Sequence, residues 1–219
     1  MSMVTMATMA QKEVGKTTFY PRVGVNLSKI SGAEYYVNSD NHAYKAKDKV
    51  GLVAGMEVEH QLTRGFALSA GMLYSMQGTN YDDSDNTNGD SRSVMKDFRE
   101  TLHYVNVPVL AVFNGGMNGF AVKAGIQLGY LIDANGAYDI EEYGRTDGRW
   151  TQTLSSSESY NARWMRNKLD VAIPVGISYE FSRVNIDLRY NFGLTNICNI
   201  DGMKAEHNRS WQLTVGYAL

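Results

Sequence analysis

The sequence has few of the residues that stabilise small disulfide-rich or metal-binding domains. Cys198 is the single cysteine, so no internal disulfide can form, and no Cys/His cluster has the spacing of a zinc site. The 21 lysines and arginines nearly balance the 23 aspartates and glutamates, which leaves a net charge of -2. We therefore expect no nucleic-acid partner, because such partners select a basic surface.

Long hydrophobic runs are also absent. The longest, such as VPVLAVF at residues 107–113, are far shorter than the roughly 20 residues that a helix needs to cross a bilayer. A strand crosses with about 9 to 11 residues, and only every second one must be apolar. A membrane protein built of helices is therefore excluded, and one built of strands is not.

What the sequence does contain is alternation of apolar and polar residues. In VNIDLRYNFGLTNI, residues 184–197, bulky apolar side chains alternate with polar or small ones. This period of two is typical of a strand. Eight stretches follow the same pattern, at about residues 18–28, 49–61, 65–78, 101–113, 120–133, 168–181, 184–197 and 209–219.

The connections between these stretches alternate between short and long. Hairpin-length turns lie at 62–64, 114–119 and 182–183, while long polar segments occupy the other connections, among them residues 135–166. Short turns on one side and long loops on the other are typical of outer-membrane barrels. We expect hairpin registers that pair apolar with apolar residues: Phe181 with Val184, Ile173 with Phe192, Val58 with Leu68, Ala54 with Met72, Phe113 with Phe120, and Val105 with Leu128.

The two faces of the stretches differ in size as well as polarity. One face carries large residues such as Phe192, Tyr190 and Leu188, and the other carries most of the glycines together with Arg189. An eight-stranded barrel has an interior just wide enough for side chains to fill, so small residues belong inside. We predict that the aromatic face meets lipid. The alternative is a soluble lipocalin-like barrel that binds a ligand with its aromatic face inside.

Several strand segments carry a family resemblance: FYPRVGVNLS, LHYVNVPVLAVF, KAGIQLGYLIDA, VAIPVGISYEF, LRYNFGLTNI and NRSWQLTVGYAL. In their order and spacing they resemble the PorT-like small outer-membrane β-barrel proteins of Bacteroidetes, from about residue 18 to the end. The resemblance implies an eight-stranded antiparallel barrel in the outer membrane, with a link to protein secretion in some members. It implies no catalytic residues.

Charged residues on the inward face must pair, because buried charges without a partner are costly. We expect Glu57 and Glu59 to face Arg22, and Lys123 and Arg189 to share Glu180. The full set of predicted lumen charges is Arg22, Glu57, Glu59, Lys123, Asp170, Glu180, Asp187 and Arg189. A structural plug is the favoured interpretation, and a narrow solute pore is the alternative.

Aromatic residues on the long segment 135–166 are candidate binding anchors, because rings bury much area at little entropic cost. They are Tyr138, Tyr143, Trp150, Tyr160 and Trp164. The alternative is that they pack over the barrel mouth. No catalytic motif frames the histidines, and the acidic segment 81–90 lacks the spacing of a calcium loop, so we expect no enzyme, metal or cofactor.

The prediction from the sequence is an all-β protein: an eight-stranded antiparallel up-and-down transmembrane β-barrel with short periplasmic turns and long extracellular loops, formed by residues 17–219. Residues 1–16 are expected to be a signal-peptide remnant or a disordered N-terminus. The expected location is the bacterial outer membrane. The expected role is non-catalytic docking or support of a secretion or envelope protein through the loops.

Overall fold

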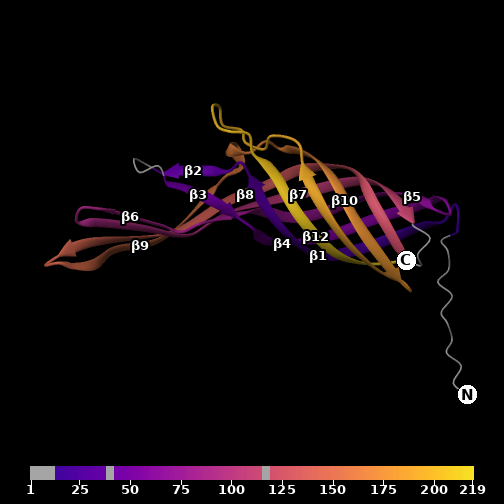
Figure 1. Cartoon of the computed structure of the whole chain (residues 1–219), viewed down its shortest axis with the longest axis horizontal. Helices are drawn as coiled ribbons and strands as arrows, with labels where there is room; N and C mark the ends of the chain where they lie inside the picture. Colours follow the sequence, from indigo (N-terminus) through magenta and orange to yellow (C-terminus); the bar gives the residue numbers. More distant parts are fainter. Residues whose placement is uncertain (1–12, 38–41, 115–118) are drawn as a thin grey trace, which may run out of the picture.

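The computed structural model describes residues 13–37, 42–114 and 119–219. Most of the predicted signal-peptide remnant at residues 1–16 lies outside the described residues, because residues 1–12 are not described. Eight long strands form a closed antiparallel barrel, in which each strand pairs with the next and the last pairs with the first (Figure 1). They are β1 (Thr17–Ser31), β4 (Lys49–Thr63), β5 (Phe66–Tyr81), β7 (Ser91–Asn114), β8 (Phe120–Thr146), β10 (Leu169–Phe181), β11 (Val184–Gly193) and β12 (His207–Tyr217).

Each of the eight predicted stretches forms one of these strands, but two strands run much further than the alternation indicates. β7 and β8 extend past the barrel, where they pair with β6 (Ser84–Asn88) and β9 (Arg149–Asn161). The prediction of a loop across residues 135–166 is therefore wrong for most of that segment. Both faces of this extension meet water, so no apolar period marks it as strand.

The outer parts of β6, β7, β8 and β9 form a four-stranded antiparallel sheet, which we call the ribbon: residues 84–88, 91–96, 139–146 and 149–161. The ribbon projects away from the barrel, at the left of Figure 1. It lies at the end of the barrel opposite the short turns. The short turns thus lie at one end of the barrel and the long connections at the other, as predicted.

Side chains of the barrel strands point alternately inward and outward. Leu188 and Phe192 are 37% and 43% exposed, whereas Arg189 between them is 1% exposed. Apolar side chains cover the outside of all eight strands, and the buried charged and polar side chains lie inside together with some apolar ones, such as Leu73 and Leu110. The prediction that bulky residues face outward is confirmed. The outward apolar run of β1, from Phe19 to Leu27, has the length that a tilted strand needs to cross a bilayer.

The hairpin registers test the prediction more finely. In the β10–β11 hairpin all the predicted pairs occur, from Phe181 with Val184 to Ile173 with Phe192. The other two hairpins are wrong by two residues. Val58 pairs with Ala70, and Phe113 pairs with Val122.

A shift of two residues leaves every side chain on its predicted face, so the alternation cannot detect it. In the β4–β5 hairpin the shift has a local cause. The ladder has an irregularity between Gln61 and Thr63, and Thr63 then pairs with Phe66 across Arg64 and Gly65. The turn therefore consists of Arg64 and Gly65 alone, whereas the polarity pattern predicted a turn of three residues at 62–64.

Two short elements complete the ribbon end, by which we mean the end of the barrel from which the ribbon projects. β2 (Glu34–Val37) pairs with β3 (His42–Lys47), which joins the end of β5 through Ala46 and Tyr81. A single 3-10 turn, η1 (Arg163–Met165), lies between β9 and β10. In the part of the chain that the structure describes, no helix is long and apolar enough to cross a membrane.

Candidate functional site: the filled lumen and the external ribbon

Six charged side chains form one continuous network inside the barrel, near the short turns. Arg22 Nε lies 2.6 Å from Glu57, which also accepts hydrogen bonds of 2.7 and 3.2 Å from Arg189. Arg189 donates a further bond of 2.7 Å to Asp187. Lys123 Nζ continues the network, 3.0 Å from Asp187 and 3.8 Å from Glu59.

This lumen network alternates three cations with three carboxylates: Arg22, Glu57, Arg189, Asp187, Lys123 and Glu59. Its members come from β1, β4, β8 and β11, and all of them are buried. Because every charge touches one of opposite sign, the network crosses the lumen without an unpaired ion.

A glycine makes room for the largest member of the network. Gly176 is the register partner of Arg189. A Cβ atom at Gly176 would lie 2.6 Å from Arg189 Cβ and 2.5 Å from the Leu188 carbonyl oxygen. The glycine therefore lets β10 approach the backbone of β11 closely at Arg189, where a side chain would clash.

Two predicted members lie apart from the network. Glu180 accepts a hydrogen bond of 2.7 Å from the Tyr20 hydroxyl and one of 3.4 Å from Asn185. The prediction that Lys123 and Arg189 share Glu180 is wrong, since both pair with Asp187 instead. Inward-facing residues on neighbouring strands can differ in height along the barrel axis, and the alternation does not give this height.

Asp170 is the other predicted charge outside the lumen network, and it lies toward the ribbon end of the barrel. Its two carboxylate oxygens accept hydrogen bonds of 2.8 Å from Thr195 and 2.8 Å from Asn208. The amide of Asn208 also donates to the Tyr104 hydroxyl over 3.2 Å. Asp170 is thus part of a neutral-donor network that joins β7, β10 and β12, and not of an ion pair.

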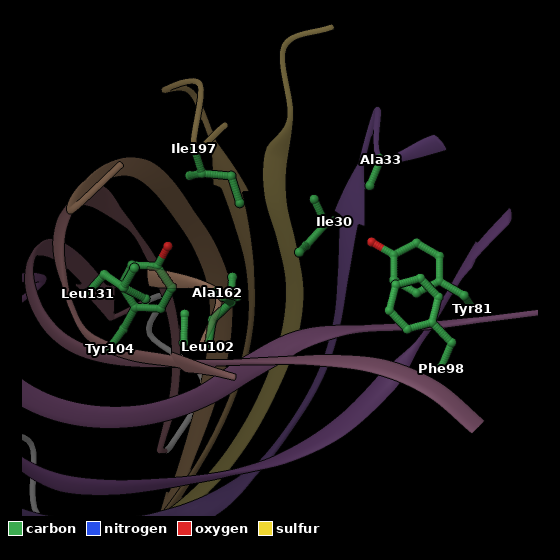
Figure 2. Close-up of a cluster of buried hydrophobic side chains, with 10 residues drawn as sticks. Ile30, Ala33, Tyr81, Phe98, Leu102, Tyr104, Leu131, Ala162 and Ile197 are labelled. Carbon is green, nitrogen blue, oxygen red and sulfur yellow. The ribbon is translucent and has the colours of Figure 1, made fainter. Parts of the chain in front are cut away.

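Buried apolar side chains gather at the end of the barrel from which the ribbon projects. They form one cluster, which we call the external plug (Figure 2). Tyr104, Leu131, Leu102 and Ala162 lie together in Figure 2, and Tyr81 stacks on Phe98 with ring centroids 4.4 Å apart. The remaining members are Ile30, Ala33, Ala134 and Ile197.

The sequence analysis did not predict an ion triad that lies beside the external plug. Arg166 lies just after η1, and it donates hydrogen bonds to Glu100 of β7, one of them 2.5 Å long, and to Glu206 before β12. All three side chains are buried. Arg166 and Glu206 lie outside the regular strands, so no alternation marks them as inward, and only their shared burial identifies the triad.

Exposed ion pairs join neighbouring strands of the ribbon. Arg92 Nε donates a hydrogen bond of 2.9 Å to Asp85, and Lys96 donates one of 2.8 Å to Glu141. The hydrogen bond from Lys96 lowers the pKa of the Glu141 carboxyl, and that from Arg92 lowers the pKa of Asp85. The acidic segment 81–90 therefore forms a hairpin strand with a basic partner strand.

The five predicted loop aromatics fall into two groups. Tyr138 and Tyr160 pack beside the external plug, with centroids 6.1 Å from Tyr138 to Phe98 and 6.5 Å between the two tyrosines. Burial raises the pKa of Tyr160 to about 12. The other three are nearer the surface: Tyr143 bonds Glu141, Trp150 lies under Arg145, and Trp164 of η1 is 67% exposed.

Each histidine whose side chain the structure describes makes its own contact, and His60 Nδ1 lies 2.8 Å from the Thr17 hydroxyl. His103 Nδ1 lies 2.6 Å from the Tyr74 hydroxyl on the outer surface of the barrel, and His207 Nδ1 lies 2.9 Å from the Thr195 carbonyl oxygen. Among residues 13–37, 42–114 and 119–219, no group of three or more His, Cys, Asp or Glu side chains could hold a metal ion. Cys198 is buried and unpaired.

Comparison with known proteins gives a family and a set of distant structural likenesses. The family described as "Outer membrane protein beta-barrel domain" matches residues 9–199. No curated protein matches the chain.

Solved structures with a similar fold include two bacterial proteins. Ail, the attachment invasion locus protein of Yersinia pestis, is 14% identical, with 94% of this chain and 100% of that chain covered and a TM-score of 0.42. Neisserial surface protein A (NspA) is 13% identical, with 92% and 98% covered and a TM-score of 0.42. At this similarity they carry no information about function.

The family match and the apolar outer surface agree with each other. A closed barrel with apolar residues outside and a polar interior leaves no backbone edge in contact with lipid. The protein is an integral β-barrel of the bacterial outer membrane. Since the match extends over most of the sequence, the chain belongs to the family of outer membrane proteins with a beta-barrel domain.

Proposed function

We propose that this protein works without catalysis, as a docking protein whose external ribbon binds an extended segment of a secreted or envelope protein. The observation that carries the proposal is the ribbon itself. One of its two edge strands, β9, pairs with β8 and with no other strand in the described part of the chain. A long unpaired edge offers backbone donors and acceptors to a partner strand.

The sequence of β9 supports this role. Natural edge strands are usually protected by lysine, proline or short length. β9 runs from Arg149 to Asn161 and has neither residue, and its centre reads LSSSES. Small hydroxyl side chains leave the edge open to another backbone. Trp150 and Leu154 add exposed apolar surface on the same strand.

The barrel itself is proposed to be a support and not a conduit. The lumen network and the external plug occupy opposite ends of the interior, so a solute would have to displace both. The family resemblance to PorT-like proteins of Bacteroidetes belongs to the same proposal, since it links this fold to secretion. The assignment of residues 1–16 to an export segment stays a prediction.

A shortened ribbon tests the docking role. Tyr138 and Glu158 are register partners, so residues 139–157 can be replaced by an Asn-Gly turn that closes the hairpin while keeping the tyrosines at the external plug. The expected result is a folded barrel that has lost the partner. Migration of the unheated protein on a gel checks the fold.

The partner is detected by a photo-crosslinking residue at Ser157 in living cells, with the same residue at Ser182 in the opposite turn as control. We expect one discrete crosslinked product from Ser157 and none from Ser182. The docking proposal fails if Ser157 gives no product of its own and cells with the shortened ribbon secrete and assemble surface proteins normally.

A further inference from the structure

The outward side chains of β11, β12 and β1 change in kind along the barrel toward the ribbon end. Aliphatic residues such as Leu213 and Val25 come first. An aromatic group follows, in which Tyr190 lies 4.3 Å from Phe192 and 4.8 Å from Trp211 between ring centroids. Aromatic rings of this kind mark the level at which hydrocarbon gives way to headgroups.

Two cations follow immediately beyond the rings. Lys29 is two residues beyond Leu27 on β1, and Arg209 is two residues beyond Trp211 on β12. Lys29 and Arg209 are register partners, so their side chains lie next to each other on the lipid-facing side. The alternation in the sequence predicts that both side chains point outward. Only the pairing of β12 with β1, which closes the barrel, brings the two cations together.

This pair is unfavourable by itself, because like charges directly opposite each other on adjacent strands repel. Among the described residues, no carboxylate forms an ion pair with either cation. The β1–β4 ladder ends with Ser28 opposite Lys49, and no ion pair joins Lys29 to Asp48, the residue before Lys49. His207, the next outward residue of β12, contacts a carbonyl oxygen and supplies no negative charge.

Arg209 is nevertheless held in place. Its Nη1 donates a hydrogen bond of 2.7 Å to the Gly193 carbonyl oxygen, and its guanidinium carbon lies 6.0 Å from the centre of the Phe192 ring. These contacts use one nitrogen and one face of the guanidinium. The remaining donors are left for an anion, and Lys29 adds an exposed ammonium from the neighbouring strand.

We propose that Lys29 and Arg209 bind a phosphate group of lipid A, the glycolipid of the outer leaflet. The level fits, because the phosphates of this lipid lie just outside its acyl chains, as the two cations lie just outside the aromatic rings. The charge fits, because a phosphate between the cations turns their repulsion into two attractions. Phe192, Trp211 and Leu27 then contact the acyl chains of the same molecule.

The test uses the purified full-length protein in detergent micelles and measures retained lipid by native mass spectrometry. The probes are phosphorylated lipid A, the same lipid A after enzymatic removal of its phosphates, phosphatidylglycerol and inorganic phosphate. We expect the protein to retain phosphorylated lipid A about tenfold or more better than the dephosphorylated form, since the phosphate supplies charge-assisted hydrogen bonds. This comparison needs no variant.

The double variant Lys29→Gln, Arg209→Gln should lose this preference. Its matched control is Arg64→Gln, Arg183→Gln, which removes two exposed cations from the short turns at the opposite end and should keep the preference. Lys29→Arg should also keep it. Equal retention of the two lipid A forms by the wild-type protein would overturn the proposal, and so would equal retention of phosphatidylglycerol or binding of inorganic phosphate alone.

Discussion

The lumen network makes a strong prediction about stability through Glu57. Its carboxylate accepts three contacts, one from Arg22 and two from Arg189, and all three side chains are almost fully buried. The substitution Glu57→Gln keeps the shape and removes the charge. Both guanidinium groups then keep their desolvation cost but lose their shared counter-ion.

Removing one partner of a buried ion pair costs about 3 to 5 kcal/mol. Gln keeps one acceptor oxygen, so we expect the lower end, about 3 kcal/mol. This value corresponds to roughly a hundredfold fall in the ratio of folded to unfolded protein, at about 1.4 kcal/mol per factor of ten. The free energy of unfolding is measured by urea titration in lipid vesicles, with tryptophan fluorescence and migration of the unheated protein as separate probes.

The matched control is Glu158→Gln on β9, where the carboxylate is exposed. Surface changes of this kind stay within about 0.5 kcal/mol. The variant Arg189→Met and its combination with Glu57→Gln complete a double-mutant cycle, which should be non-additive because the two side chains touch. A loss at Glu57 no larger than that at Glu158, with additive double variants, would refute the view that the lumen is closed by ion pairs.

Four further predictions follow from other contacts. Arg166→Met leaves two buried carboxylates without their cation, so amide hydrogen exchange should increase at the mouth by the ribbon and stay unchanged at the short turns. The wild-type barrel and Lys123→Ala should both show no steady conductance in planar bilayers, because the external plug remains, and an open-channel current in either would contradict a filled lumen. Glu141 has a lowered pKa, so its contribution to ribbon stability is present above its ordinary pKa of about 4.3 and is lost as the pH falls through the lower folded value, which carboxyl chemical shifts in an acid titration will show. Gly176→Ala should prevent folding because its Cβ has no space, whereas Gly144→Ala, whose nearest neighbour would lie 3.4 Å away, should give a normally folded band on an unheated gel.

The barrel and the ribbon are two parts of the molecule for which we expect different stability. The barrel has paired strands all round and buried charges, so its backbone is protected from lipid and water. The ribbon is a sheet with two edges and exposed ion pairs. Exposed ion pairs contribute little, so we expect the ribbon to open locally before the barrel does.

Much of the fold follows from the alternation of residue types. The outward position of Leu188 and Phe192 and the inward position of Arg189 follow from the period of a strand, because each neighbouring side chain must take the opposite face. The register of the β10–β11 hairpin also follows, since its turn has only two residues. The number of barrel strands follows from the eight alternating stretches.

Other features needed the tertiary structure. The registers of the β4–β5 and β7–β8 hairpins differ from the prediction by two residues, and the alternation could not reveal this because such a shift changes no face. The ribbon carries polar residues on both sides, so its strands have no apolar period. The partners of Lys123 depend on heights along the barrel axis, which are set by the stagger of strands that are distant in sequence.

The amino-acid sequence alone thus determined which side chains meet lipid and which fill the interior, because this choice is repeated at every second residue and needs no knowledge of neighbours. Tertiary structure decided which charges meet: Arg189 with Glu57 across the lumen, Arg166 with Glu100 and Glu206 at the mouth, and Lys29 beside Arg209 on the outside. These contacts arise from the closure and stagger of the barrel, and no local pattern encodes them.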